Sequence, residues 1–131
     1  MRDIKFRGLD SKGNWIFGLL FYSYGIGEYK ITHSNGWLPS YSNPDEGETT
    51  LHTNINIKTV GQFTGLVDKN GVDVYEGDIV KTTHIISFGI IEYKNKGFLI
   101  KDINQDIYVG DRYNWNDIEI IGNIHSNPEL L

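Results

Sequence analysis

Polar and apolar residues alternate at the start of the chain. Within residues 1–9, Ile4 and Phe6 fall at one parity, and Lys5 and Arg7 fall at the other. A β-strand directs successive side chains to opposite faces, so this alternation predicts a strand with one face toward solvent. The polar run that follows predicts a turn.

The next segment, residues 15–22, has the sequence WIFGLLFY and is apolar at both parities. Such a strand is either central and covered on both faces, or its outer face meets another subunit. A chain of 131 residues offers few layers to cover both faces. The segment is therefore our first candidate for an oligomer contact, through Trp15, Phe17, Leu20 and Tyr22.

The chain is organised around residues 62–80, which contain three turn signals. The dipeptide Asn70-Gly71 is the strongest of them, because a type I′ turn needs positive φ at both central positions. We therefore expect residues 63–67 and 72–75 to pair as a hairpin.

An architectural corner is expected after this hairpin. Gly77 allows a sharp change of direction, and Asp78 is expected to accept hydrogen bonds from nearby backbone N–H groups. Gly89 suggests a bend of the kind that a small barrel needs, and residues 94–97 predict a second hairpin turn. Further strands are predicted at residues 79–82, 84–93, 98–101, 107–109 and 118–124.

Residues 23–58 form a long excursion that is rich in Gly, Ser, Asn and Thr. We expect it to be irregular, apart from short strand-like pieces at residues 29–32 and 55–58. Trp37 and Tyr41 would be unusual in a disordered tip, so they either fold back as a lid or contact a partner.

The composition agrees with a mainly β protein in one domain. Aromatic residues make up 13% of the 131 residues, there are 15 glycines, and alanine is absent. Scarce helix formers and abundant turn residues favour strands. We expect an N-terminal β-hairpin over residues 1–22, the irregular excursion over 23–58, and a small β-barrel with a C-terminal turn over 59–131.

Charge and cysteine content limit the partners and the compartment. The net charge of −5 disfavours a general electrostatic grip on nucleic acid, because Lys and Arg supply most non-specific affinity for phosphates. The absence of cysteine is compatible with a reducing cytoplasm. The longest apolar run is residues 15–22, which is too short to span a membrane. We therefore expect a soluble cytoplasmic protein without a membrane partner.

The carboxylates near the central hairpin are candidates for metal binding or acid–base catalysis. The sequence DKNG at residues 68–71 resembles the start of a calcium loop, but Asp73 would stand where that loop requires glycine. We favour a hairpin turn with solvated carboxylates. Glu76 and Asp78 could form an acid and base pair, but the turn at Gly77 removes the alternation that would place them on one face.

Other catalytic patterns are not evident. His33, His52, His84 and His125 lack the spacing of a metal site. No serine lies in a nucleophile elbow, and the glycines match neither a phosphate loop nor a dinucleotide fingerprint. We therefore predict a protein that is not an enzyme, with no catalytic residues, no metal site and no cofactor. A metal site assembled from residues on different strands stays open as an alternative.

The chain resembles the YopX family of phage and prophage proteins in four blocks: IKFRG at 4–8, NWIFG at 14–18, TVGQFTGLVDKNGVDVYEGDIVK at 59–81 and IGNIHSNPELL at 121–131. The match runs from end to end, while the excursion carries no recognisable motif. The resemblance implies an SH3-like β-barrel in at least the C-terminal part, and a bacteriophage or prophage origin. It supplies no mechanism, so no catalytic residue is carried across.

The function that we expect is a phage or prophage accessory protein in the cytoplasm of a bacterial host. It would associate with itself and bind a phage or host protein, with the barrel as a scaffold. The alternative is a nucleic-acid-binding protein that stacks bases on Trp37, Tyr41 or Trp115. A third hypothesis, a small enzyme acting through Asp, Glu and His, would need a deep pocket with convergent carboxylates.

Overall fold

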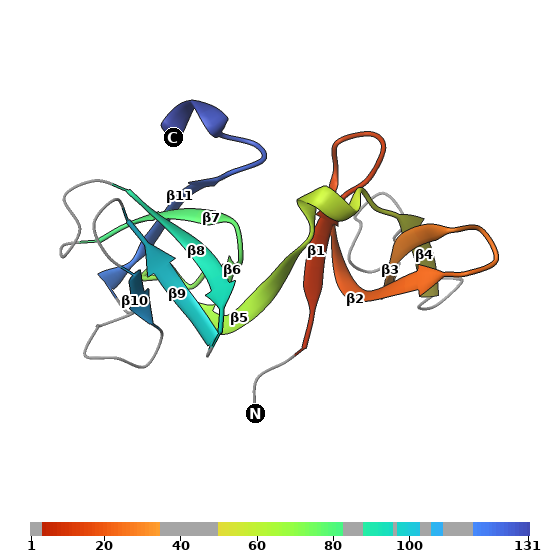
Figure 1. Ribbon diagram of the computed structural model, residues 1–131, viewed down its shortest axis with the longest axis horizontal. Coiled ribbons are helices and arrows are strands. Elements are labelled where there is room, and N and C mark those ends of the chain that lie inside the picture. The colour runs from red at the N-terminus through yellow and green to blue at the C-terminus, as the bar shows by residue number, and fades with distance from the viewer. Residues whose placement is uncertain (1–3, 35–49, 83–87, 96, 103–105, 109–116) are drawn as a thin grey trace. The chain divides into compact units, whose positions relative to one another are not determined.

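The computed structural model describes residues 4–34, 50–82, 88–95, 97–102, 106–108 and 117–131 (Figure 1). The chain divides into two compact units, an N-terminal unit over Ile4–Gln62 and a C-terminal unit over Phe63–Leu131. Both consist of antiparallel strands, with two short 3₁₀ helices in the described residues. The prediction of a mainly β protein is therefore confirmed.

The N-terminal unit is a meander in the strand order β4-β3-β2-β1, extended by the first residues of β5 beside β1. Neighbouring strands in this order are also consecutive in the sequence, and the short β1–β2 and β2–β3 connections favour antiparallel neighbours. The four strands are β1 (Phe6–Leu9), β2 (Trp15–Ser23), β3 (Glu28–Ser34) and β4 (Thr50–Asn54).

Strand β2 changes partner at its middle, as Figure 1 shows. Its first half pairs with β1 up to Gly18, and its second half pairs with β3 from Leu19 onward. A Cβ atom at Gly18 would overlap the carbonyl oxygen of Thr32, so only glycine allows the two backbones to approach this closely. The small core on the inner side comprises the buried residues Ile16, Ile31 and Ile55 with Phe6, Leu20 and Val60 packed against them.

The excursion at residues 23–58 is more regular than expected. The strand-like piece at residues 29–32 lies within β3, which confirms it, and β4 is a strand that was not expected. The piece at 55–58 is wrong as a strand, because η3 (Ile57–Thr59) is a 3₁₀ helix. The side chain of Asn56 accepts the Lys58 N–H at 3.1 Å, and this local bond favours a helical turn over an extended strand.

The C-terminal unit contains the later part of β5 and six further strands. The hairpin of β5 (Gly61–Val67) and β6 (Asp73–Tyr75) precedes a sheet in the order β10-β9-β8-β7-β11. A buried cluster fills this unit, and it consists of Val74, Val80, Ile91, Phe98, Ile100 and Ile118. The strands of the sheet are β7 (Asp78–Lys81), β8 (Gly89–Lys94), β9 (Gly97–Lys101), β10 (Asp106–Tyr108) and β11 (Glu119–Asn123).

The central hairpin forms as predicted, but its turn is of a different type. Phe63 pairs with Tyr75 across β5 and β6. Gly71 has a φ of +81°, whereas Asn70 is not among the described residues with positive φ, so the type I′ turn was wrong. The N–H of Gly71 instead donates to the Asp68 carbonyl, which is the pattern of a three-residue loop that ends in a left-handed glycine.

The corner after the hairpin also forms. Gly77 has a φ of +93°, and the Asp78 carboxylate accepts the Tyr75 N–H at 2.8 Å. The N–H of Gly77 donates to the carbonyl of Ile91, which ties the corner to β8. Both predicted roles, the sharp turn at Gly77 and the backbone acceptor at Asp78, are confirmed.

The strand pairs of the described residues form open sheets, and none closes into a barrel. The predicted bend at Gly89 coincides with the first residue of β8. Register shifts of the described strands lie instead between Phe63 and Val67 of β5 and between Ile120 and Gly122 of β11. After β11, η5 (Pro128–Leu130) is the short helical turn that the sequence suggests.

Candidate functional site

The outer face of β2 presents large apolar side chains to solvent. Ile16 and Gly18 point to the core and are buried. The alternate positions are exposed: Phe17 at 37%, Leu19 at 57% and Phe21 at 36%. Because contiguous exposed apolar side chains mark interaction sites more often than scattered ones do, this stripe is the candidate site. We call these three residues the β2 outer face.

The neighbouring strands extend this surface. Phe21 lies opposite Lys30 of β3, and Leu19 lies opposite Thr32. The ring of Phe21 meets the imidazole of His52 edge to face, with 5.5 Å between the ring centroids. Thr32 and His52 are joined by a hydrogen bond of 3.1 Å between Oγ1 and Nδ1. The polar neighbours on β3 and β4 therefore form one edge of the apolar stripe.

Cations lie beside the β2 outer face although the chain is acidic overall. Arg7 lies opposite Phe17 on β1, and its guanidinium stacks on the Trp15 ring at 4.6 Å from the centroid. On the neighbouring strand β3, Lys30 lies opposite Phe21 on the same face. The face therefore combines aromatic rings with cations in a chain of net charge −5.

The residues predicted as an oligomer contact are divided between two faces. Trp15 and Phe17 belong to the outer side, with Trp15 half-buried beneath Arg7. Leu20 packs against the core on the inner side, and Tyr22 shares that side. The four residues therefore lie on two sides of the strand, and their role as an oligomer contact stays a prediction.

Sequence reasoning missed two members of the stripe, Leu19 and Phe21. The signal was the alternation of Trp15, Phe17, Leu19 and Phe21, which gives a strand face. The residues at the alternate positions of this strand are equally apolar, so the sequence pattern does not show which side of the strand is exposed. The candidate binding residues Trp37, Tyr41 and Trp115 lie outside the described residues.

Tyrosines gather where the inner side of β2 reaches the β2–β3 turn. Tyr22 contacts both Tyr24 and Tyr29, with 4.9 Å between ring centroids in each pair. Tyr24 is 90% exposed and Ile26 in the same turn is 63% exposed. The turn therefore exposes a second group of apolar side chains, on the other side of the strand from the β2 outer face.

Each unit also has one open cleft lined by described residues. A cleft of about 680 Å³ in the N-terminal unit has a mixed lining, with Asp10, Glu28 and Ile57 among its residues. A cleft of about 430 Å³ in the C-terminal unit is largely apolar, with Phe88 and Leu130 in its lining. Neither cleft brings together catalytic groups in a pattern that defines a reaction.

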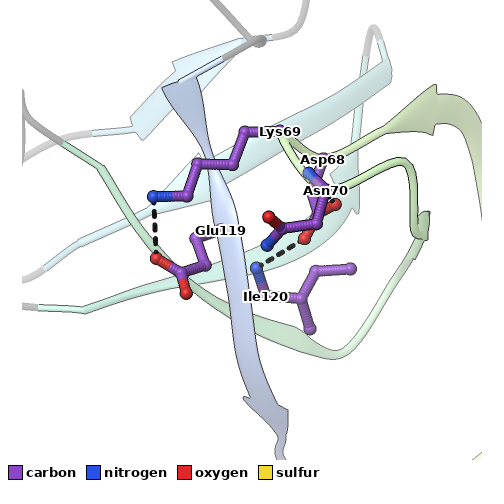
Figure 2. Close-up of polar contacts among 5 residues, drawn as sticks. All are labelled: Asp68, Lys69, Asn70, Glu119 and Ile120. Carbon is purple, nitrogen blue, oxygen red and sulfur yellow. Dashed lines mark hydrogen bonds and ion pairs between the residues drawn. The ribbon is translucent and has the colours of Figure 1, made fainter.

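The carboxylate of Asp68 is committed to the backbone (Figure 2). One oxygen accepts the N–H groups of Asn70 at 2.8 Å and Val72 at 3.0 Å, and the other accepts the Ile120 N–H at 3.1 Å. The side chain is only 4% exposed, so the expectation of solvated carboxylates at this turn was wrong for Asp68. It closes the β5–β6 loop and connects that loop to β11.

These contacts change the acidity of Asp68. Burial raises its pKa, but the N–H donors of Val72, Ile120 and Asn70, helped by the positive charge of Lys69, outweigh burial and lower the pKa below the ordinary value of 3.8. A carboxylate with a lowered pKa holds its charge and accepts hydrogen bonds near neutral pH. The geometry therefore gives Asp68 a structural role.

Membrane-spanning helices and metal clusters are two further kinds of site, and the described part of the chain contains neither. No helix there is long and apolar enough to cross a membrane. No group of three or more His, Asp or Glu side chains is placed to hold a metal ion in the same residues.

Comparisons with known proteins place the chain in a family. The sequence profile of the family described as YopX protein matches residues 5–131. The crystal structure of protein EF1440 from Enterococcus faecalis is similar over 100% of this chain and 99% of that chain, with a TM-score of 0.56 and 22% sequence identity. At this low sequence identity, the structural similarity shows only that the two proteins share a fold. No curated protein matches. The chain belongs to the YopX family.

Proposed function

We propose that this protein is a non-enzymatic binding module that associates with itself and contacts a protein partner through the β2 outer face. The observation that carries the proposal is the exposure of Phe17, Leu19 and Phe21 side by side on one regular strand. Burying a side chain the size of Leu or Phe contributes about 1.5–3 kcal/mol, so a partner that covers this stripe gains binding energy.

The position of Leu19 at the middle of the stripe supports a protein partner. Leu19 is 57% exposed, with Phe17 and Phe21 on either side along the strand. Residues at the centre of a patch dominate protein interfaces because their neighbours exclude water from them. A flexible lysine or glutamate at this position would protect the strand from contacts, and leucine does the opposite.

Two described carboxylates of the central block, Asp68 and Asp78, support a structural role over catalysis. Both oxygens of Asp68 accept backbone N–H groups, and Asp78 accepts the Tyr75 N–H. General acid and base catalysis needs a carboxyl group that can reach a substrate proton. Carboxylates whose oxygens accept backbone N–H groups stabilise the fold. This favours a binding module over an enzyme.

Nucleic acid is the second candidate partner, and a specific observation favours it. The aromatic rings of Phe17 and Phe21 share their face with the half-buried Lys30, whereas the neighbouring Arg7 is buried against Trp15. Rings that stack on bases beside cations that meet phosphates are the usual means of binding single strands. The net charge of −5 and the leucine between the rings weigh against this candidate.

The proposal also includes the biological setting of the protein and the finer classification of its fold. Membership of the YopX family supports the proposal of a phage or prophage accessory protein that acts in the bacterial cytoplasm. The finer classification of the C-terminal unit as an SH3-like barrel belongs to the same proposal. The bonds from the Asp68 turn to β11 support it, because they bring the β5–β6 hairpin against the sheet.

A pull-down with matched variants tests the proposed function. The full chain, Leu19→Thr and Val72→Thr are tagged and used to capture proteins from a bacterial host lysate, with and without nuclease. Val72 is 52% exposed in the C-terminal unit, so its variant removes a comparable apolar side chain elsewhere. We expect the captured proteins to survive nuclease, and their yield to fall about tenfold with Leu19→Thr alone.

Two outcomes would reject this proposal. Capture that disappears with nuclease would move nucleic acid to first place. Equal yields of captured protein with Leu19→Thr and with Val72→Thr would show that the β2 outer face is not the contact surface.

A further inference from the structure

The edge strands of the described sheets differ in how they are protected. An exposed edge offers unpaired N–H and C=O groups, and proteins usually blunt it with charges, proline, bulges, short length or a cover. Strand β6 has three residues and begins with Asp73, and β10 has three residues and begins with Asp106. Strand β11 has a register shift and is covered by the Asp68 turn.

Strand β4 has none of these protections. It runs over five residues, Thr50–Asn54, with the sequence TLHTN, which contains no charged residue at pH 7, no proline and no glycine. Its register with β3 is continuous over all five pairs. Among the described residues β3 is its single neighbouring strand. Strand β4 is therefore the described edge that is best suited to accept another strand.

The hydrogen bonds show which groups of β4 point outward. The N–H of Ile55 donates to the Tyr29 carbonyl at 2.9 Å, just beyond the last paired residue of β4. Hydrogen-bonded and non-hydrogen-bonded pairs alternate along an antiparallel ladder. Thr53 and Leu51 therefore bond to β3, while the N–H and C=O groups of residues 50, 52 and 54 point to the open edge.

We infer that two copies of this chain associate by pairing their β4 strands in antiparallel orientation about a two-fold axis at His52. His52 then pairs with His52 of the second copy, and Thr50 of each copy pairs with Asn54 of the other. This register satisfies all the outward groups with on the order of six hydrogen bonds. The inference rests on the proposed self-association and names the surface that performs it.

The second copy is favoured as occupant because the strand is complementary to itself. A symmetric contact places each residue against the same strand, so a charged edge would repel its own copy. The strand TLHTN is uncharged within a chain of net charge −5, which removes this repulsion at the contact. Strand addition also derives its affinity from main-chain hydrogen bonds and so tolerates polar side chains.

This pairing also enlarges the proposed binding surface. A two-fold axis perpendicular to a continuous sheet leaves the same face of both copies on the same side. Phe21 contacts His52, so the apolar stripes of the two copies would be joined through the paired β4 strands. A protein partner would then meet both stripes at once.

Sedimentation velocity with a matched pair of variants tests the inference. The full chain, His52→Ala and His52→Pro are compared from about 1 to about 200 µM, a range suited to modest interfaces. Both substitutions remove the imidazole, but only proline removes the outward N–H, while the bonds to β3 are kept. We expect the chain and His52→Ala to associate, and His52→Pro to do so about tenfold more weakly or worse.

Amide hydrogen exchange on the unmodified chain gives a second measurement that does not depend on a variant folding. The N–H groups of His52 and Asn54 should exchange more slowly in concentrated than in dilute samples. The Thr53 N–H, bonded to β3, should exchange at the same rate in both.

The outcomes separate this inference from the proposed function. Equal association of His52→Ala and His52→Pro, or exchange at His52 and Asn54 that is independent of concentration, would overturn β4 pairing and leave self-association by another surface. A chain that stays monomeric throughout would overturn both β4 pairing and the proposed self-association.

Discussion

The two units of this protein distribute their apolar side chains in different ways. The C-terminal unit encloses a cluster of six buried residues, including Val80, Ile91 and Ile100, each with no exposed surface. Among the described residues, the N-terminal unit has a buried cluster of three, Ile16, Ile31 and Ile55. Buried area is the main source of folding free energy, so the C-terminal unit has the larger reserve of stability.

The N-terminal unit has instead most of the large apolar side chains that are exposed in the described residues. Leu19, Tyr24 and Ile26 are examples, at 57%, 90% and 63% exposure. A side chain at the surface contributes little to folding but remains available to a partner. The comparison suggests that the C-terminal unit maintains the fold and that the N-terminal unit makes the contacts.

The largest expected effect comes from the C-terminal core. Ile91→Ala removes buried methyl groups and should lower the free energy of unfolding by about 2–5 kcal/mol. Ile31→Ala makes the same change in the N-terminal core and should cost less, because fewer buried side chains surround it. Urea denaturation of the two variants measures the difference. A larger loss for Ile31→Ala would reverse the comparison.

The next effect comes from the Asp68 turn. Asp68→Ala leaves the N–H groups of Asn70, Val72 and Ile120 without their acceptor. Because unsatisfied buried donors are costly, we expect a loss of about 2–4 kcal/mol in urea denaturation. A loss below about 0.5 kcal/mol would mean that solvent replaces the carboxylate easily.

The same residue predicts a dependence on pH. The pKa of Asp68 is lowered in the folded chain, so its stabilisation is fully present above the ordinary value of 3.8 and is lost as the pH falls below it. Between about pH 5 and about pH 2, the unmodified chain should therefore lose stability more steeply than Asp68→Asn. Parallel slopes in the two proteins would contradict a lowered pKa.

An intermediate effect is expected where β2 changes partner. Gly18→Ala places a methyl group against the Thr32 carbonyl oxygen and should cost about 1–3 kcal/mol. Gly25→Ala is the control, because no atom lies within 4 Å of the added Cβ at that position. Thermal denaturation of both variants gives the measurement. Equal stabilities would mean that β2 can shift without cost.

A smaller effect is expected from the ion pair above the Asp68 turn. Lys69 and Glu119 lie 3.0 Å apart with side chains that are 49% and 39% exposed. Exposed ion pairs contribute little because water and salt screen them, so Lys69→Ala should change stability by less than about 1 kcal/mol. Addition of salt should shrink even this difference, and a salt-independent loss would point to another role for Lys69.

The sequence was informative where structure depends on neighbours in the chain. The Gly77 and Asp78 corner and the β5–β6 hairpin follow from residues a few positions apart. The burial of Asp68 could not be predicted in this way, because its partner Ile120 is 52 positions away. Strand β4 was missed for a similar reason, since its polar sequence becomes a strand through pairing with β3.

The β2 outer face was predicted in part. The apolar composition of residues 15–22 predicted a strand that is either covered on both faces or has an outer face that meets another subunit. Leu20 lies on the inner side and Leu19 on the outer side, because both parities are apolar and the core that Ile31 and Ile55 complete decides which of them faces inward. The oligomer contact that includes Leu20 stays a prediction. Only the three-dimensional arrangement distinguishes the two faces.

The central claim is that the apolar side chains of the β2 outer face are dispensable for folding, and urea denaturation of Leu19→Thr tests it most directly. Threonine suits a strand and removes most of the apolar surface at this position. We predict a free energy of unfolding within about 0.5 kcal/mol of the unmodified chain. A loss of about 2 kcal/mol or more would place Leu19 in the protein's own core and contradict its assignment to a binding surface.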